Sequence, residues 1–292
     1  MDPALRMIHR FALSSGELVF EVGTLRRPEF VLRFTNCQNV AVDERFLTSA
    51  FPLVPTPSRL VAIVMVAGCI DLEHGGLIEP GDSILVDIST FGRIRSKNAC
   101  HLNLEWASNE RALRATPCRL GRPALEQVMK IAGALFDRNS AQRSTLANAF
   151  ELFRTIGAPL TLSVEGLEGE PSSRDRRFAR AMEEQLENVA SRATTTFHMG
   201  DSLGLTERQI HRLVEDFNTR YGINARSWRD ARNRWRIQSA ALLLSRLELT
   251  VADVAREVGY ASPNALARAF SKVGFPPPAI VRRQMSEMDP SR

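Results

Sequence analysis

Hydrophobic and polar residues alternate over short segments in the first third of the chain. Turn-forming sequences such as "HGG", "EPGD" and "RSKN" separate the apolar segments, which read "ELVFEV", "EFVLRF", "RLVAIVMV", "SILVDI" and "CHLNLEW". Short segments with glycine and proline between them are typical of a small antiparallel barrel or jelly roll. We therefore expect a compact β domain that begins near Glu17 and extends to about Trp106.

The hydrophobic period then changes to that of a helix. One apolar stripe consists of Leu125, Val128, Met129, Ala132, Leu135 and Phe136, and a second of Leu146, Ala149, Phe150, Phe153 and Ile156. Two helices are expected, and their stripes suit either a core or a dimer face. Residues 163–176, "SVEGLEGEPSSRDR", have the composition of a linker. A chain of 292 residues is long enough for two cores. We expect a first domain over 1–162, a linker over 163–176 and a helical domain over 177–292.

Two short helices lie close around a glycine in "LTVADVAREVGYASPNALARAF". Thr250 is placed to cap the first helix, with Asp253 three residues on, and Gly259 is placed to end it. Ser262 then caps a second helix whose inner face holds Leu266, Ala269, Phe270 and Val273. This is the pattern of a helix-turn-helix unit, in which the second helix enters the major groove of DNA.

A second unit of this kind lies upstream, in "MGDSLGLTERQIHRLVEDFNTRYG". Thr206 is placed to cap a helix whose inner face holds Ile210, Leu213, Val214, Phe217 and Tyr221. A long helix that includes "RIQSAALLL" separates the two units. Two reading helices joined by such a rod would meet major-groove faces about one turn of DNA apart.

At these residues the sequence resembles the AraC/XylS family of bacterial transcription regulators. The matching features are "LGLTERQIHR", "VADVA", "GYAS" and "ARAF", together with Phe217, Gly222, Arg236 and Pro278, over roughly residues 176–283. One departure is that the stretch from Thr206 to Gly222 is about three residues longer than the usual spacing. The resemblance implies an α+β protein that joins a small jelly-roll or cupin-like barrel with two helices to an all-α double helix-turn-helix domain.

The resemblance also implies a function, which is sequence-specific binding of operator DNA as a regulator, as an activator in contact with RNA polymerase. It places base contacts at Arg208, His211, Arg212, Asn264 and Arg268, and a homodimer with an effector in the first domain. The distribution of charge agrees with DNA binding by the helical domain, because residues 201–292 hold 15 Lys and Arg against 10 Asp and Glu, whereas the rest of the chain has no net charge.

Two short motifs suggest what the effector is. "RMIHR" is an RxxxR pattern and "DISTFG" a DxSxxG pattern, and together they resemble the signatures of PilZ domains, which bind cyclic di-GMP. Two arginines can grip phosphates, while an acceptor and a hydroxyl can meet a guanine edge. The residues of this effector site would be Arg6, Arg10, Asp87, Ser89 and Gly92, on a basic N-terminal arm folded over a barrel strand. An unidentified small organic effector is the alternative.

Other classes of protein have weaker support. The four cysteines form no CxxC pair, so we expect free thiols, no metal, no cofactor and no DNA-repair alkyl transferase. The His and Glu residues do not cluster as in a cupin metal enzyme, and we expect no enzyme activity. An architectural DNA binder is a further alternative. No apolar run is long enough to span a bilayer, so we expect a cytoplasmic protein.

Overall fold

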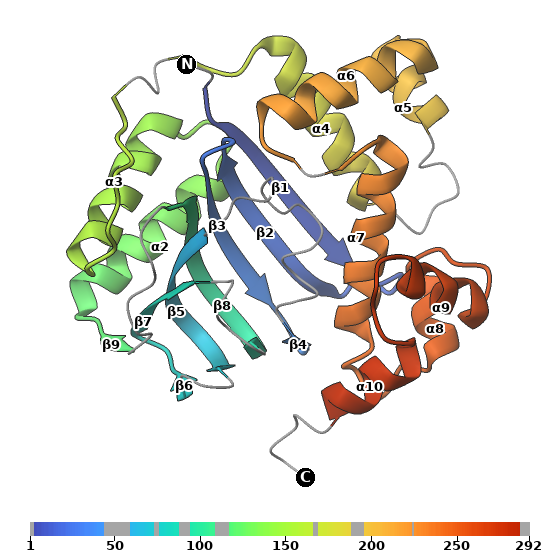
Figure 1. Ribbon diagram of the computed structural model, residues 1–292, viewed down its shortest axis with the longest axis horizontal. Coiled ribbons are helices and arrows are strands. Elements are labelled where there is room, and N and C mark those ends of the chain that lie inside the picture. Colours follow the sequence, from blue (N-terminus) through green and yellow to red (C-terminus); the bar gives the residue numbers. More distant parts are fainter. Residues whose placement is uncertain are drawn as a thin grey trace.

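Strands from the first part of the chain pair in antiparallel fashion into one sheet, which Figure 1 shows beside the helices. The computed structural model describes residues 3–43, 59–72, 76–87, 94–108, 117–165, 169–187, 196–223 and 225–286. Within these, the strand order is β1, β2, β3, β8, β5, β7 and β9, with β4 on β8 and β6 on β5. The strands are β1 (Leu5–Ala12), β2 (Leu18–Arg26), β3 (Phe30–Cys37), β4 (Ala41–Asp43), β5 (Arg59–Leu72), β6 (Gly76–Ile78), β7 (Asp82–Asp87), β8 (Ile94–Ala107) and β9 (Cys118–Arg119).

The helices follow the strands in the chain. They are α2 (Arg122–Phe136), α3 (Gln142–Thr155), α4 (Ser173–Glu187), α5 (Thr196–Leu203), α6 (Glu207–Arg220), α7 (Trp228–Leu243), α8 (Val251–Glu257), α9 (Pro263–Lys272) and α10 (Pro278–Ser286). The expected α+β organisation, strands with two helices followed by an all-helical part, is confirmed. In the described part of the chain, no helix is both long and apolar enough to cross a membrane.

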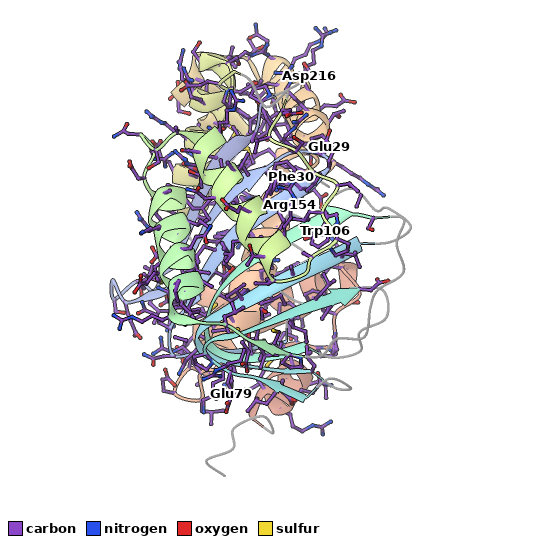
Figure 2. The ribbon with its side chains drawn as sticks, turned by 90° about the vertical axis from the view of Figure 1, so that its left-hand side faces the viewer. Glu29, Phe30, Glu79, Trp106, Arg154 and Asp216 are labelled. Carbon is purple, nitrogen blue, oxygen red and sulfur yellow. The ribbon has the colours of Figure 1, made fainter. Side chains whose placement is uncertain are left out.

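One face of the sheet, called here the outer face, packs against α2 and α3. Buried leucine and aromatic residues of β2, β3, β5 and β8 meet the apolar stripes of the two helices there. The rings of Phe30 and Phe150 lie edge to face with centroids 5.4 Å apart, and Figure 2, seen from the side of α2 and α3, labels Phe30 and Trp106 on the sheet and Arg154 on α3. Most of both stripes is therefore core, but Met129 is 51% exposed.

The opposite face, called the inner face, packs in part against the helical domain. Buried residues of β1 and β2 share one hydrophobic cluster with residues of α4 and α6 to α10. Trp235 of α7 lies at the centre of this contact, with its ring 5.1 Å from the rings of both His9 and Phe20. Because one core spans both parts of the chain, the helical domain is packed on the sheet, as Figure 1 shows along β1.

The N-terminal segment differs from the expected arm. Residues 5–12 form strand β1, which pairs with β2 along its whole length, so that Arg10 lies opposite Glu21. Alternate apolar residues of this segment, among them Met7 and Phe11, complete the core shared with the helices. The helical part also begins earlier than expected, because Ser172 caps α4 inside the predicted linker.

Candidate nucleic-acid interface

The first helix-turn-helix unit consists of α5 and α6. Thr206 accepts a hydrogen bond from the backbone N–H of Gln209, whose side chain in turn accepts from Thr206, which completes a capping box. The inner face of α6 is buried as expected, at Ile210, Leu213, Val214 and Phe217. The opposite face of α6 is exposed and carries Arg208, His211 and Arg212, which a binding partner can therefore reach.

The second unit consists of α8 and α9. Thr250 and Asp253 form a capping box at the start of α8. At its end, the N–H of Tyr260 donates to Ala255 O over 2.7 Å and the N–H of Gly259 to Arg256 O over 2.9 Å. This is a Schellman motif, which needs the left-handed backbone that Gly259 adopts at φ +75°.

The reading helix of the second unit is short and basic. Ser262 caps α9 at the N–H of Ala265, and Pro263 occupies its first turn. Leu266 and Phe270 are buried, while Asn264 and Arg268 are exposed. Val273, expected on the inner face, is 38% exposed and lines a cleft of about 400 Å³ between α9 and α7, beside Arg268.

Helix α7 joins the two units and orients the second. Ser227 caps it at the N–H of Asp230. The guanidinium of Arg236 lies 4.0 Å from the ring centre of Tyr260 and donates to Val258 O over 2.5 Å. Burial lowers the pKa of Arg236, and the aromatic ring and carbonyl compensate the buried charge. Sequence reasoning did not connect these residues, because the link between a helix and a turn 22 residues away has no local signal.

The predicted effector residues that the structure describes, Arg6, Arg10 and Asp87, do not form one site. Arg6 is 8% exposed and donates to Asp137 O over 2.7 Å and Ser140 O over 2.9 Å, at the end of α2. Arg10 is exposed and forms an ion pair with Glu21 at 3.4 Å. Asp87 is buried on β7, with β2, β3, β8 and β5 between its strand and β1 in the sheet order. Ser89 and Gly92 lie outside the described residues.

The remaining chemistry of the described residues is sparse. Cys37, Cys69, Cys100 and Cys118 are free thiols. Burial raises the pKa of Cys100 to about 11, which keeps it protonated at neutral pH. Among the described residues, no group of three or more His, Cys, Asp or Glu side chains is arranged to hold a metal ion.

Comparison with known families identifies the C-terminal part of the chain. A family described as "Helix-turn-helix domain" matches residues 199–284. Residues 199–284 are a helix-turn-helix domain. The match includes α6 to α9 and most of α10, so the helix-turn-helix domain contains both reading helices.

Solved structures give weaker similarities. ToxT from Vibrio cholerae O395 is 11% identical over 90% of this chain and 97% of that chain, with a TM-score of 0.34. ToxT from V. cholerae strain SCE256 with a bound unsaturated fatty acid is 9% identical over 96% and 95%, with a TM-score of 0.32. The AraC-like transcriptional activator CuxR is 15% identical over 93% and 81%, with a TM-score of 0.22. No curated protein matches the chain. Structural similarity this low supports no inference about this chain.

Proposed function

We propose that the protein is a sequence-specific DNA-binding transcription regulator of the AraC/XylS type. One observation carries the proposal, which is that the helix-turn-helix domain holds two capped units on a common helix, each with exposed arginine on its reading helix. Helix α7 has 16 residues and is therefore about 24 Å long. Reading helices at the two ends of such a rod suit neighbouring major-groove faces of one DNA duplex.

Each reading helix has a proposed set of base contacts. Asn264 and Arg268 lie on the exposed face of α9, and Arg208, His211 and Arg212 on that of α6. Arginine suits the acceptors of guanine, and asparagine suits adenine, in the major groove. The proposal further includes a homodimer, contact with RNA polymerase and activation of transcription, in line with the family that the sequence resembles.

The sheet domain is proposed to bind a small effector. Support for cyclic di-GMP on Arg6 and Arg10 is reduced, because backbone carbonyls already occupy the guanidinium of Arg6 and a carboxylate pairs with Arg10. We therefore favour the other alternative, a small organic effector. The shared core between sheet and helices gives such a ligand a physical route to the DNA-reading helices.

The test is DNA binding by the full chain to an operator selected from random sequences and to its scrambled version. Arg268→Ala should reduce the preference for the operator by about 1–3 kcal/mol, because an arginine that reads a base contributes mainly to discrimination. Arg122→Ala is the control, since Arg122 lies on α2 and is 90% exposed. If Arg268→Ala weakens binding to both DNAs equally, or if wild type shows no preference, an architectural binder explains the domain better.

A further inference from the structure

The cleft of about 400 Å³ between α7 and α9 is a second feature of the helix-turn-helix domain, beside the exposed faces of the reading helices. Its α7 wall includes Asp230 and Arg234, which lie in the half of the helix that follows the first unit. Its α9 wall extends from Ala265 to Val273. Figure 1 shows α9 beside α7 and below α6. The cleft therefore lies on the side of the second reading helix that is turned towards the first unit.

The walls of this cleft carry excess positive charge. Its cations are Arg234, Arg268 and Lys272. Asp230, the one carboxylate among the lining residues that the structure describes, already accepts from Arg234 Nε over 3.2 Å and from the N–H of Arg226 over 3.0 Å. Arg268 and Lys272 are exposed and form no ion pair with the described part of the chain. Two cations of α9 are therefore available to an anion in the cleft.

The cleft also offers a hydroxyl and an apolar wall. Tyr260, in the turn between α8 and α9, lines the cleft, and its hydroxyl is buried without a hydrogen-bond partner among the described residues. Buried polar atoms are nearly always satisfied, and a native exception calls for an explanation. Ile237, Ala269 and Val273 line the same cleft, and Val273 is 38% exposed. A partner that combines anionic oxygens with an apolar part matches these walls.

A strand of DNA has this combination, because each nucleotide joins one charged phosphate to a deoxyribose ring of largely apolar surface. Two successive major grooves on one face of a duplex are separated by the sugar–phosphate strands that border the minor groove. If α6 and α9 lie in such grooves, one of these strands passes between the two units and along the side of α9 that is turned towards the first unit. The cleft is on that side.

We propose that the cleft between α7 and α9 holds a segment of the DNA backbone, with phosphate oxygens accepting from Lys272 and from the Tyr260 hydroxyl and a sugar against Val273. The inference rests on the proposed function and deepens it, because contacts to the backbone fix the position of a domain on DNA without reading bases. Lys272 and Tyr260 are not among the base contacts predicted from the sequence. Arg268 lines the same cleft and joins it to the reading face.

The first test is the salt dependence of DNA binding by the full chain, on the selected operator and on its scrambled version. Lys272→Gln should reduce the slope of log affinity against log salt by about 1 and weaken both DNAs equally, by about threefold to tenfold at low salt. Lys272→Arg keeps the charge and should keep the wild-type slope. Lys130→Gln, an equal change of charge at an exposed position of α2, is the matched control and should bind like wild type.

The second test concerns the hydroxyl. Tyr260→Phe removes the hydroxyl alone and keeps the ring that Arg236 contacts 4.0 Å from its centre. Both DNAs should bind about threefold to tenfold more weakly, because a hydrogen bond to phosphate is lost, and the salt slope should stay unchanged, because no charge is removed. The melting temperature should stay at or above the wild-type value, since an unsatisfied buried hydroxyl is lost. A purely structural hydroxyl would instead lower the melting temperature and leave DNA affinity unchanged.

The third test locates the contact on the DNA. Neutral methylphosphonate linkages replace the phosphates of the operator one at a time. In wild type, a linkage between the sequences read by the two units should weaken binding, because it removes the charge that Lys272 meets. The same linkage should have no further effect in Lys272→Gln.

Three results would overturn the inference. These are an unchanged salt slope in Lys272→Gln, an equal fall of the slope in Lys130→Gln, or methylphosphonate effects that Lys272→Gln retains at every position. Binding of a free deoxynucleoside monophosphate that Tyr260→Phe abolishes and that displaces DNA would assign the cleft to a small ligand instead. A wild type that prefers its operator, with an unchanged slope in Lys272→Gln, would lose only this inference. A wild type without operator preference would contradict the proposed function, while the slope would still test the cleft.

Discussion

The two helix-turn-helix units are attached to the rest of the protein in different ways. The first is held by buried groups. Arg26 of β2 is 2% exposed and donates to Tyr221 O over 2.9 Å and Gly222 O over 2.8 Å, just beyond the C-terminus of α6. A cation there also interacts favourably with the helix dipole. Gly222, at φ +64°, allows Pro28 to approach so closely that a Cβ would lie 2.8 Å from Pro28 Cα.

The second unit is attached through partly exposed polar contacts. Ser14, in the turn between β1 and β2, donates from both N–H and Oγ to Glu257 at the end of α8. Arg246, just before α8, donates to Glu17 of the same turn over 2.9 and 3.2 Å. Contacts of this kind contribute little to stability. The polar contacts that link the sheet to the units are therefore buried for the first unit and partly exposed for the second, while both units also share the hydrophobic core with the sheet.

The two reading helices, α6 and α9, also differ in charge. Helix α6 carries three arginines and three acidic residues, whereas α9 carries one arginine and one lysine with no acid. A net positive face is favoured beside phosphates, and a neutral face is not. We infer that the basic second unit contributes more to DNA affinity than the first.

The largest expected effect is on the buried attachment of the first unit. Asp175 is 3% exposed and accepts hydrogen bonds from Arg220 over 2.7 Å and from the hydroxyl of Tyr221 over 2.8 Å. Asp175→Ala should lower the free energy of unfolding by about 2–4 kcal/mol, because it leaves a buried hydroxyl unpaired and removes the buried carboxylate that pairs with the partly exposed Arg220. Urea unfolding measures this change in the free energy of unfolding. Asp175→Asn, which keeps an acceptor, should lose less, and equal losses would contradict this account.

Acid should weaken the packing of β1 against α7. His9 lies 5.1 Å from Trp235, and burial, followed by the charges of Arg26, Arg33 and Arg138, lowers its pKa to about 3. In the folded protein His9 is neutral. Its contribution to the free energy of unfolding is therefore complete above pH 6.5 and is lost as the pH falls towards 3. At pH 5 the loss is about 2 kcal/mol.

The measurement is urea unfolding of wild type and His9→Phe at pH 7 and pH 5. Burial raises the pKa of Glu183, which acts in the opposite direction in both proteins. The difference between the two proteins therefore isolates His9, and the variant should lose about 2 kcal/mol less than wild type on acidification. Equal losses would show that His9 does not resist protonation in the folded protein.

Local features of the helix-turn-helix units could be predicted from the sequence, because their causes lie within a few residues. Caps at Thr206, Thr250 and Ser262 and the turn at Gly259 are examples, and each occurs as expected. The exposed reading faces follow from the same helical period. The packing on the outer face of the sheet could be predicted equally well, since its strands and the apolar stripes of α2 and α3 have clear hydrophobic periods.

Long-range contacts could not be predicted in this way. The bond from Arg26 to Tyr221 joins residues 195 apart, and no pattern in either segment indicates it. The RxxxR motif looked like a phosphate site, but Arg6 binds the carbonyls that end α2. An arginine that satisfies backbone carbonyls and one that awaits a ligand have the same sequence signature. The structure alone shows that Arg6 is an arginine of the first kind.

A smaller effect tests the charge of the first reading helix. Asp216 is exposed on α6, at the end of the molecule opposite Glu79 in Figure 2. Asp216→Asn should raise affinity for any DNA about twofold to threefold at low salt, because it removes one surface charge that repels phosphate. Glu79→Gln, an equal change of charge far from the reading helices, is the control. An equal gain in both variants would assign the effect to net charge rather than to α6.

The smallest effect is expected at the attachment of the second unit. In Glu17→Gln the melting temperature should stay at the wild-type value, because Glu248 still pairs with Arg246 at 2.5 Å and the Glu17 side chain is 40% exposed. Arg246→Ala should lower it, since Arg246 is 11% exposed and both carboxylates lose their partner. Differential scanning calorimetry of the three proteins makes the comparison. A clear drop in Glu17→Gln would show that the partly exposed contacts of the second unit also contribute to stability, and the contrast between the two attachments would then lose its basis.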